Sequence, residues 1–274
     1  MTSPKQVLKS IGPKLVPFFK TLAIYFVVFI PEDNPSLLAM FIKCLPVASL
    51  LLFVLMHGMS LGNEYAFSRR ILIGLMFSCL GDGLLVWREL FLYGMVSFGI
   101  GHMFFISAFG FQPLNLSLGI PMYIASMFGL SVWLPQQTLI YKMTVPIYTA
   151  LLVTMAWRAA ARVRFFEDLW TWTKLCSCVG GFFFVISDAI IGFHMFYSPI
   201  PYGQVLIMTT YYAAQLGIAL SVVDSKASYI REEESRKKKK QQRHLLLNEQ
   251  EGGSIMAGSA GTDIRHRPIG SVEN

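Results

Sequence analysis

Long apolar segments separated by short polar connections make up most of the first 223 residues. About 20 consecutive apolar residues are enough to cross a bilayer as one helix. Eight such segments are predicted, although Lys20, Lys43 and Lys142 interrupt or border the first, second and sixth. Their approximate bounds are 14–30, 37–56, 71–88, 91–110, 117–135, 138–158, 172–196 and 203–223. The pattern predicts an all-α membrane protein, a bundle of eight transmembrane helices.

The C-terminal segment differs in composition from the rest of the chain. REEESRKKKKQQR is followed by a Gly- and Ser-rich stretch with too few apolar residues to form a core. We therefore expect two parts: an eight-span transmembrane catalytic domain at 1–224 and a basic, disordered, cytosolic tail at 225–274. A sharper interpretation of Lys237 to Lys240 is that they hold the tail against anionic lipid.

Composition supports a membrane protein and argues against a nucleic-acid-binding one. Hydrophobic residues make up 54% of the chain and charged residues 14%, whereas about a quarter of a soluble domain is charged. Ten of the 23 Lys and Arg residues lie in the last 49 positions, so the net charge of +7 partly describes the tail. The four cysteines lie in apolar segments without a CxxC pair, which argues against a disulfide framework or a zinc site.

Basic residues in alternate connections predict the orientation. Arg69 and Arg70 precede the third segment, and Arg158, Arg162 and Arg164 separate the sixth from the seventh. The positive-inside rule then places both termini in the cytosol. An even number of spans agrees with this orientation.

Two acids interrupt segments that are otherwise apolar. Asp82 lies in FSCLGDGLLVW (77–87) and Asp188 in FVISDAII (184–191). Ionisable side chains inside a membrane are rare and usually face a bundle interior or a wet cavity. Either these acids only fix helix packing through hydrogen bonds, or they carry chemistry.

Other polar residues are predicted at a similar depth. At 1.5 Å per residue, Asp82 and Lys43 lie about 9 Å from the non-cytosolic ends of their segments. The corresponding estimate is about 12 Å for Asp188 and Tyr211, and about 16 Å for His102. Each residue also has a structural interpretation, such as a core histidine or a lysine that extends to the interface. Their shared layer favours one common site.

A faint internal similarity points the same way. The second segment contains KCLPVASLLL from Lys43, and the sixth contains KMTVPIYTALL from Lys142. Each is followed by a segment with one of the two acids. A parallel 4+4 pseudo-repeat would place Asp82 and Asp188 at equivalent, facing positions.

Two buried carboxyl groups suit acid–base chemistry. One can act as a general acid while the other remains ionised. Such a pair suits cleavage through an oxocarbenium-like cation, which the carboxylate stabilises or attacks with activated water. Because the substrate must reach this layer of the membrane, an amphiphile with an alkyl chain is expected.

A series of short motifs runs through the apolar segments. They are FSCLGD (77–82), HMFFISAFG (102–110), ISD (186–188) and TYYAAQ (210–215), with GPKLVPFF (12–19) and KCLP (43–46) before them. In order and spacing they resemble the lysoplasmalogenase family of YhhN-type membrane proteins, and its vertebrate members in particular. The resemblance covers residues 12–224 and omits the tail.

The resemblance implies hydrolysis of the vinyl ether bond of lysoplasmalogens, giving a fatty aldehyde and glycerophosphocholine or glycerophosphoethanolamine. It also implies an endoplasmic-reticulum membrane, no cofactor and no metal. Asp82 and Asp188 would be the catalytic acid and base, in either order. The expected substrate-binding or supporting residues are Lys43, Arg88, His102, Tyr211, Tyr212 and Gln215. The expected partner is a lysophospholipid within the membrane, and the oligomeric state is left open, a homodimer included.

Three other functions fit parts of the pattern. A proton-coupled transporter of a small or amphiphilic solute also uses acids near mid-membrane. An intramembrane aspartyl protease fits poorly, because CLGD replaces its GxGD motif and the two acids are four spans apart. A zinc amidohydrolase of the ceramidase type would need His57, His102 and His194 together, although they lie at different depths.

Overall fold

The structure of this chain is a computed structural model, which describes residues 4–57, 60, 62–163 and 172–223 and, beyond these, 229–230, 234, 237–238 and 241–242. The chain divides into two units, Met1–Lys226 and Ala227–Asn274. Most of the predicted tail, and Arg164 of the predicted basic connection, lie outside the described residues.

Within the described residues the chain is entirely helical, with eight α-helices and three short 3-10 helices. The α-helices are α1 (Pro4–Val28), α2 (Leu37–Met56), α3 (Ala66–Leu84), α4 (Phe91–Phe109), α5 (Leu116–Trp133), α6 (Leu139–Ala161), α7 (Trp172–Phe196) and α8 (Gly203–Leu220). The 3-10 helices are η1 (Asn63–Tyr65), η2 (Arg88–Leu90) and η3 (Leu134–Gln136). The predicted all-α class is confirmed.

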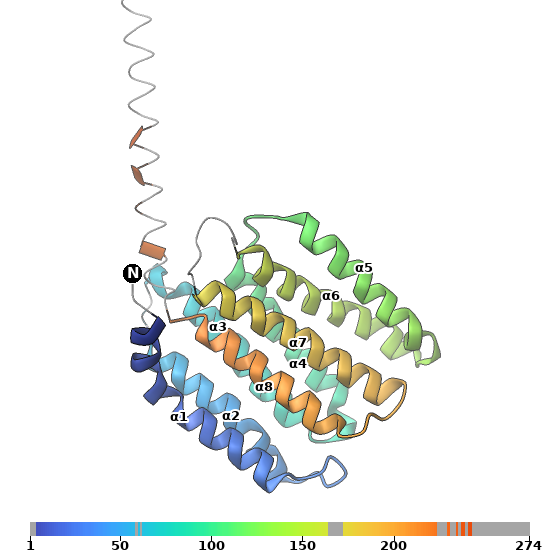
Figure 1. Cartoon of the computed structure of the whole chain (residues 1–274). Coiled ribbons are helices and arrows are strands. Elements are labelled where there is room, and N and C mark those ends of the chain that lie inside the picture. The colour runs from blue at the N-terminus through green and yellow to red at the C-terminus, as the bar shows by residue number, and fades with distance from the viewer. Residues whose placement is uncertain are drawn as a thin grey trace, which may run out of the picture. The chain divides into compact units, whose positions relative to one another are not determined.

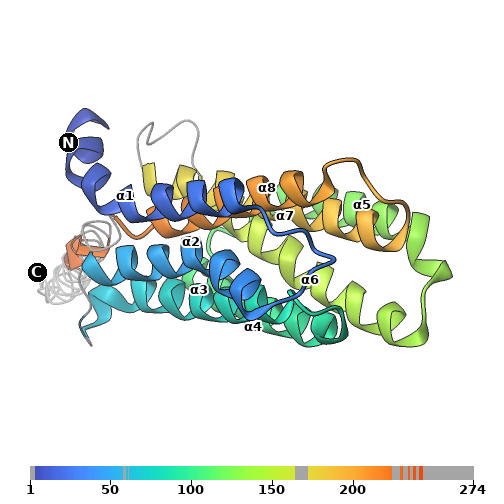
Figure 2. The ribbon, with the colours of Figure 1, turned by 90° about the horizontal axis from the view of Figure 1, so that it is seen from below.

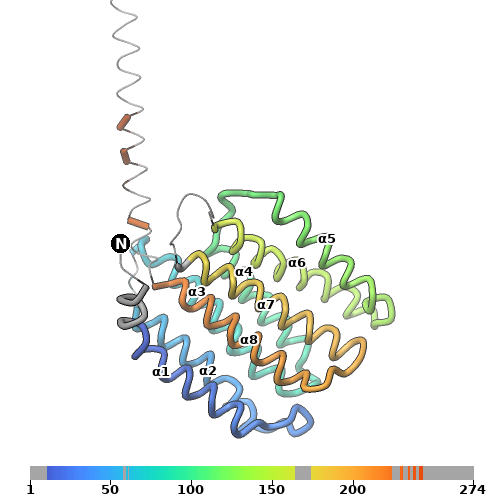
Figure 3. The backbone as a smooth tube through the Cα atoms, in the orientation of Figure 1, coloured from blue at the N-terminus to red at the C-terminus, as the bar shows by residue number. Residues whose placement is uncertain are grey.

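The helices of the first unit lie side by side in two layers. In Figure 1, α1 and α2 form one edge and α5 with α6 the opposite edge, while α3 and α4 lie behind α7 and α8. Seen from below, α1, α7 and α8 lie over α2, α3 and α4 (Figure 2). The backbone tube in Figure 3 shows that the helix axes run in similar directions. This arrangement places α3, α4, α7 and α8 at the centre.

Six helical segments of the described chain are long and apolar enough to cross a membrane. They are Ile11–Val28, Leu37–Met56, Arg88–Phe109, Leu116–Gln136, Leu139–Ala161 and Lys174–Phe196. They include all three segments that a lysine interrupts or borders, because one charge is outweighed by the surrounding apolar residues. The chain is a multi-pass membrane protein.

The two helices outside that set are α3 and α8. Their polar content lowers their hydropathy, since α3 contains Arg69, Arg70 and Asp82, and α8 contains two threonines and Gln215. Both helices pack among others in the bundle, and each buries about half of its residues. Asp82 of α3 and Gln215 of α8 are among the buried ones. Burial inside the bundle explains why these helices tolerate polar residues that lipid-facing helices exclude.

Small residues bring two pairs of helices close together. In the α3–α4 pair, a Cβ added to Gly101 would lie 3.1 Å from the carbonyl oxygen of Gly74. In the α7–α8 pair, a Cβ added to Gly180 would lie 2.8 Å from the carbonyl oxygen of Ala214. Because lipid tails are as apolar as leucine, membrane helices associate through this kind of close backbone contact.

Two serines join the same helix pairs by hydrogen bonds. The Ser97 hydroxyl of α4 donates to the carbonyl oxygen of Phe77 in α3 at 2.7 Å. The Ser187 hydroxyl of α7 donates to the carbonyl oxygen of Ile207 in α8 at 3.1 Å. Short polar side chains of this kind hold neighbouring membrane helices in register.

The third helix begins and ends earlier than predicted. The sequence predicts a span over 71–88, whereas α3 covers Ala66–Leu84 and a turn at Leu85–Trp87 leads into η2. The glycines that flank Asp82 weaken the helix at this end. Asp82 therefore lies in the last turn of α3, nearer the helix end than the predicted depth.

Arg158 corrects another expectation. The sequence assigns it to a cytosolic connection, but α6 extends to Ala161 and the Arg158 side chain is fully buried. Its guanidinium donates to the carbonyl oxygens of Gly110 at 2.7 Å, Pro113 at 2.8 Å and Leu114 at 3.3 Å. A buried charge needs such partners, so Arg158 anchors the connection between α4 and α5.

The close contact of α7 and α8 generates a stability prediction. Gly180→Ala should lower the stability of the folded protein by about 1–3 kcal/mol, because its new methyl group would overlap backbone atoms of α8. Thermal unfolding of the purified protein in detergent measures the change. The matched control is Gly129→Ala in α5, where no atom lies within 4 Å of the added Cβ. Equal melting temperatures for the two variants would contradict the proposed packing.

Candidate active site

Asp82 is held by a tyrosine from another helix. Its side chain is 2% exposed, in the last turn of α3. The hydroxyl of Tyr211, in the middle of α8, donates to Asp82 Oδ2 at 2.6 Å. This bond joins residues 129 positions apart and satisfies one oxygen of a buried carboxyl group.

Asp188 belongs to a second hydrogen-bonded group, which three helices build. The hydroxyl of Tyr148 in α6 donates to Asp188 Oδ2 in α7, and His102 Nε2 in α4 lies 3.2 Å from the same hydroxyl oxygen. Because the Tyr148 hydroxyl donates its hydrogen bond to the carboxylate, its oxygen is the acceptor of the bond with His102, and His102 Nε2 is the donor. The order is His102 to Tyr148 to Asp188.

This assignment leaves the other nitrogen of His102 as an acceptor. His102 is 0% exposed, and its Nδ1 has no hydrogen-bond partner within the described chain. Buried polar atoms normally have a partner. A buried acceptor without a partner is a suitable place for a water molecule or a substrate hydroxyl.

Two phenylalanines connect the two groups. The ring of Phe184 in α7 lies 5.6 Å from that of Tyr211 and 4.8 Å from that of His102. The ring of Phe98 in α4 lies 5.8 Å from Tyr211 and 6.1 Å from Phe184. Asp82 and Asp188 thus share one aromatic region of the interior, although no hydrogen bond joins their carboxyl groups among the described residues.

Lys43 and Tyr212 are connected to each other through the backbone of α2. Lys43 is half-buried in α2 and interacts electrostatically with Asp82, without an ion pair between them in the described part of the chain. The Tyr212 hydroxyl donates to the backbone oxygen of Lys43 at 2.8 Å. Its ring packs 5.3 Å from that of Tyr25. Tyr212 therefore braces α8 against α1 and α2 and contacts neither acid through its hydroxyl.

Gln215 and Arg88 occupy opposite environments. Gln215 is fully buried, one turn after Tyr211 and close enough to interact with its hydroxyl. Neither its amide nitrogen nor its amide oxygen has a well-formed hydrogen bond within the described residues. Arg88 is exposed at the start of η2, where no described residue binds it. Gln215 thus belongs to the buried region, and Arg88 lies at the bundle surface.

Sequence reasoning missed Tyr148, which holds Asp188. Tyr148 lies within KMTVPIYTALL, the segment whose similarity to the second span suggests a repeat. A signal was present, because the hydroxyl of a tyrosine inside a membrane helix needs a hydrogen-bond partner. The sequence does not say which helix supplies that partner.

The three histidines of the zinc interpretation lie in separate interactions. His57 caps α2 with Nδ1 2.8 Å from the carbonyl oxygen of Phe53. His194 Nδ1 accepts from the backbone N–H of Ile200 at 2.8 Å, and His102 bonds Tyr148. Among the described residues no three His, Cys, Asp or Glu side chains gather as metal ligands do.

The sequence predicts one cavity lined by both Asp82 and Asp188. Two cavities of about 340 and 330 Å³ open on the bundle, and neither is lined by Asp82 or Asp188. One lies at the loop ends of α1 and α7, and the other lies between α5 and α6. That both acids line a single cavity stays a prediction.

Comparison with known proteins identifies relatives for most of the chain. Residues 38–222 match the YhhN family. Lysoplasmalogenase TMEM86A is 42% identical in Bos taurus and 43% in Homo sapiens, each over 228 residues that cover 82% of this chain and 95% of the relative. Lysoplasmalogenase TMEM86B of Sus scrofa is 36% identical over 217 residues, which cover 78% of this chain and 88% of that protein.

No solved structure matches the chain. The matched region contains both acids, both tyrosines that bind them, and His102. The resemblance inferred from the short motifs is therefore confirmed over the part of the chain that forms the candidate site. The chain belongs to the YhhN family.

Proposed function

We propose that this protein is a lysoplasmalogenase, a membrane enzyme that hydrolyses the vinyl ether bond of lysoplasmalogens. The products are a fatty aldehyde and glycerophosphocholine or glycerophosphoethanolamine. Relatives named lysoplasmalogenase, which align with most of the chain, support this activity. The observation that carries the chemistry is the placement of two carboxyl groups inside a membrane bundle, each bound by a tyrosine hydroxyl.

The reaction needs an acid and a base at one bond. A carboxylic acid protonates the β-carbon of the vinyl ether, and the cation that forms is an oxocarbenium ion. A carboxylate balances this cation and takes a proton from the water that attacks the α-carbon. The hemiacetal then passes its hydroxyl proton to the ether oxygen and collapses to aldehyde and alcohol.

Asp82 and Asp188 supply these two groups in our proposal. Each has one oxygen bound by a tyrosine, which orients the carboxyl group and leaves its other oxygen for substrate or water. Nδ1 of His102 would accept a hydrogen bond from water or substrate, while Nε2 of the same ring bonds the tyrosine that holds Asp188. Lys43 and Arg88 supply cations for the phosphate, and Gln215 and Tyr212 support the walls.

A proton-coupled transporter is the second function to be tested. The chain His102–Tyr148–Asp188 is a continuous series of hydrogen bonds through the membrane interior, as proton-coupled carriers use. Purified protein in detergent has no proton gradient across it. Release of aldehyde there identifies an enzyme, and its absence favours the carrier.

The proposal includes a topology. All eight α-helices cross the membrane, in two parallel halves of four helices each. The α3–α4 pair of the first half corresponds to the α7–α8 pair of the second half. The α3–α4 and α7–α8 pairs support this, because each has an acid in its first helix and an interhelical serine bond. The catalytic unit is 1–224, both termini face the cytosol, and the membrane is that of the endoplasmic reticulum.

Removal of either carboxyl group should abolish most of the activity. Asp82→Asn and Asp188→Asn should each lower kcat by about 100-fold or more, since general acid–base groups contribute at least that much. Aldehyde release from lysoplasmenylcholine, coupled to an alcohol dehydrogenase, measures the rate. A variant that folds normally and keeps more than about a tenth of the wild-type rate would remove that aspartate from the mechanism.

Loss of the Tyr148 hydroxyl should impair catalysis without unfolding the protein. Tyr148→Phe breaks the bonds to Asp188 and His102, and we expect kcat to fall about tenfold or more. The matched control is Tyr123→Phe, whose hydroxyl bonds Thr154 at 2.5 Å between α5 and α6. If the two variants lose the same activity at similar melting temperatures, the Tyr148 hydroxyl has no special role.

The tail should be dispensable for turnover. Truncation after Lys226 removes Lys237 to Lys240 but none of the residues placed in the site. Turnover in detergent should stay within about twofold of wild type, while binding to vesicles with anionic lipid should weaken. A large loss of kcat in the well-folded truncated protein would contradict the assignment of catalysis to 1–224.

A further inference from the structure

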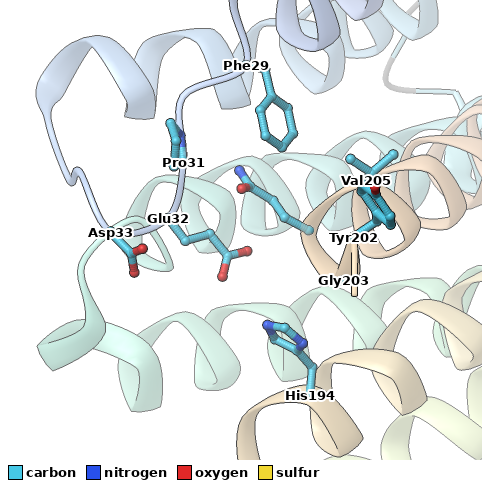
Figure 4. Close-up of a pocket in the computed structure, with 9 residues that line it drawn as sticks. Phe29, Pro31, Glu32, Asp33, His194, Tyr202, Gly203 and Val205 are labelled. Carbon is cyan, nitrogen blue, oxygen red and sulfur yellow. The ribbon is translucent and has the colours of Figure 1, made fainter. Parts of the chain in front are cut away.

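A cavity of about 340 Å³ opens between the α1–α2 connection and the α7–α8 connection (Figure 4). The residues that give it its chemistry are Phe29, Glu32, Asp33, His194, Tyr202 and Gln204. No lysine or arginine is among its lining residues. The cavity therefore combines two carboxylates with two aromatic rings and one histidine.

The polar groups approach the cavity from both sides. Glu32 and His194 point toward one another across it, and Asp33 lies next to Glu32 on the same connection (Figure 4). Because His194 Nδ1 accepts from the backbone N–H of Ile200, the neutral imidazole has its proton on Nε2. The two carboxylates, which are the charged groups here, favour a cation.

Aromatic rings complete a site suited to an ammonium group. Phe29 is half-buried with its ring directed into the cavity (Figure 4), and Tyr202, which is 83% exposed, lies at its rim. Ring faces attract quaternary ammonium ions. Gln204 fixes the wall, since its amide donates to the Tyr25 hydroxyl at 3.3 Å and to the carbonyl oxygen of Ile30 at 2.9 Å.

The position of the cavity matches the length of a lysophospholipid head. His194 is six residues beyond Asp188 on α7, which is about 9 Å along the helix. Gln204 is seven residues before Tyr211, the partner of Asp82, which is about 10 Å along α8. From the ether oxygen of a lysoplasmalogen to its amine nitrogen there are nine single bonds, which span about 10 Å, as three extended residues do.

We propose that this cavity binds the ammonium group of the choline or ethanolamine head of the substrate while its ether bond reaches the two acids. The proposal rests on the proposed function. A primary ammonium group donates hydrogen bonds to Glu32 and Asp33, whereas a quaternary one cannot and depends on the rings of Phe29 and Tyr202. The cavity would thus accept both heads through different contacts.

Binding of lipids that cannot be hydrolysed tests the site separately from catalysis. The probes are saturated 1-O-alkyl-glycerophosphocholine, its ethanolamine counterpart, and 1-O-alkyl-glycerophosphate, which has the same chain and phosphate but no amine. Calorimetry on the full-length protein in detergent should give about tenfold tighter binding of the two amine lipids. This advantage should disappear in the double variant Glu32→Gln, Asp33→Asn.

Two further variants separate the contacts. Tyr202→Ala should weaken binding of the choline lipid more than that of the ethanolamine lipid, and Tyr202→Phe should restore it, because the ring face is what binds. Glu89→Gln is the matched control. It removes one exposed carboxylate from the connection between α3 and α4, outside the cavity, and should keep the full advantage.

The outcomes are distinct. A double variant with an unchanged melting temperature that still prefers amine lipids would overturn the site, as would a wild type without that preference. Choline chloride that binds as tightly as the lipid would assign the cavity to free ammonium compounds and overturn the head-group role. Wild type that binds as expected but releases no aldehyde would reject the proposed hydrolysis and leave the head-group site standing.

Discussion

A carboxyl group inside a membrane must find hydrogen-bond partners in the protein, because the surrounding lipid offers none. Asp82 and Asp188 meet this requirement with tyrosine hydroxyls from α8 and α6. A hydroxyl satisfies a carboxyl oxygen without adding a second charge to the interior. Both bonds join different helices, so the requirement also determines which helices must be neighbours and how each is rotated about its axis.

Close packing of small residues makes these neighbours possible. Gly180 and Gly217 allow α7 and α8 to approach with backbone in contact, and Gly74 with Gly101 does the same for α3 and α4. Once the helices are this close, the rings of Phe98 and Phe184 pack against Tyr211 and His102, which belong to the hydrogen-bonded groups of the two acids. The region around the two acids is therefore formed by packed rings and by the polar side chains that bind the acids.

Asp82 lies in the last turn of α3 and Asp188 about two turns before the end of α7. Both acids therefore lie toward the end of the bundle that carries the α1–α2, α3–α4 and α7–α8 connections (Figure 2). In the proposed enzyme, an amphiphile that enters from the membrane would keep its alkyl chain among lipid-facing helices and its head at this end. The acidic, aromatic cavity at the loops of α1 and α7 lies on the same side as the acids. In the proposed enzyme, head-group binding and bond cleavage thus share helices α7 and α8, which couples the position of the ammonium group to that of the ether bond.

The sequence by itself determined the helices and the presence of two membrane acids. Apolar length decides where a span begins and ends, so the predicted bounds of 37–56 and 172–196 agree with α2 and α7. The prediction from apolar length was wrong at α3, where local glycines end the helix early. The predicted position of Arg158 in a connection was also wrong, because its charge is buried. The identity of Tyr148 as the partner of Asp188, the role of Tyr212 as a brace and the cavity at Glu32 came only from the tertiary structure. A helix pattern records which residues are polar, but which polar residues meet depends on helix rotation and neighbours, and these are fixed by packing between segments distant in the chain.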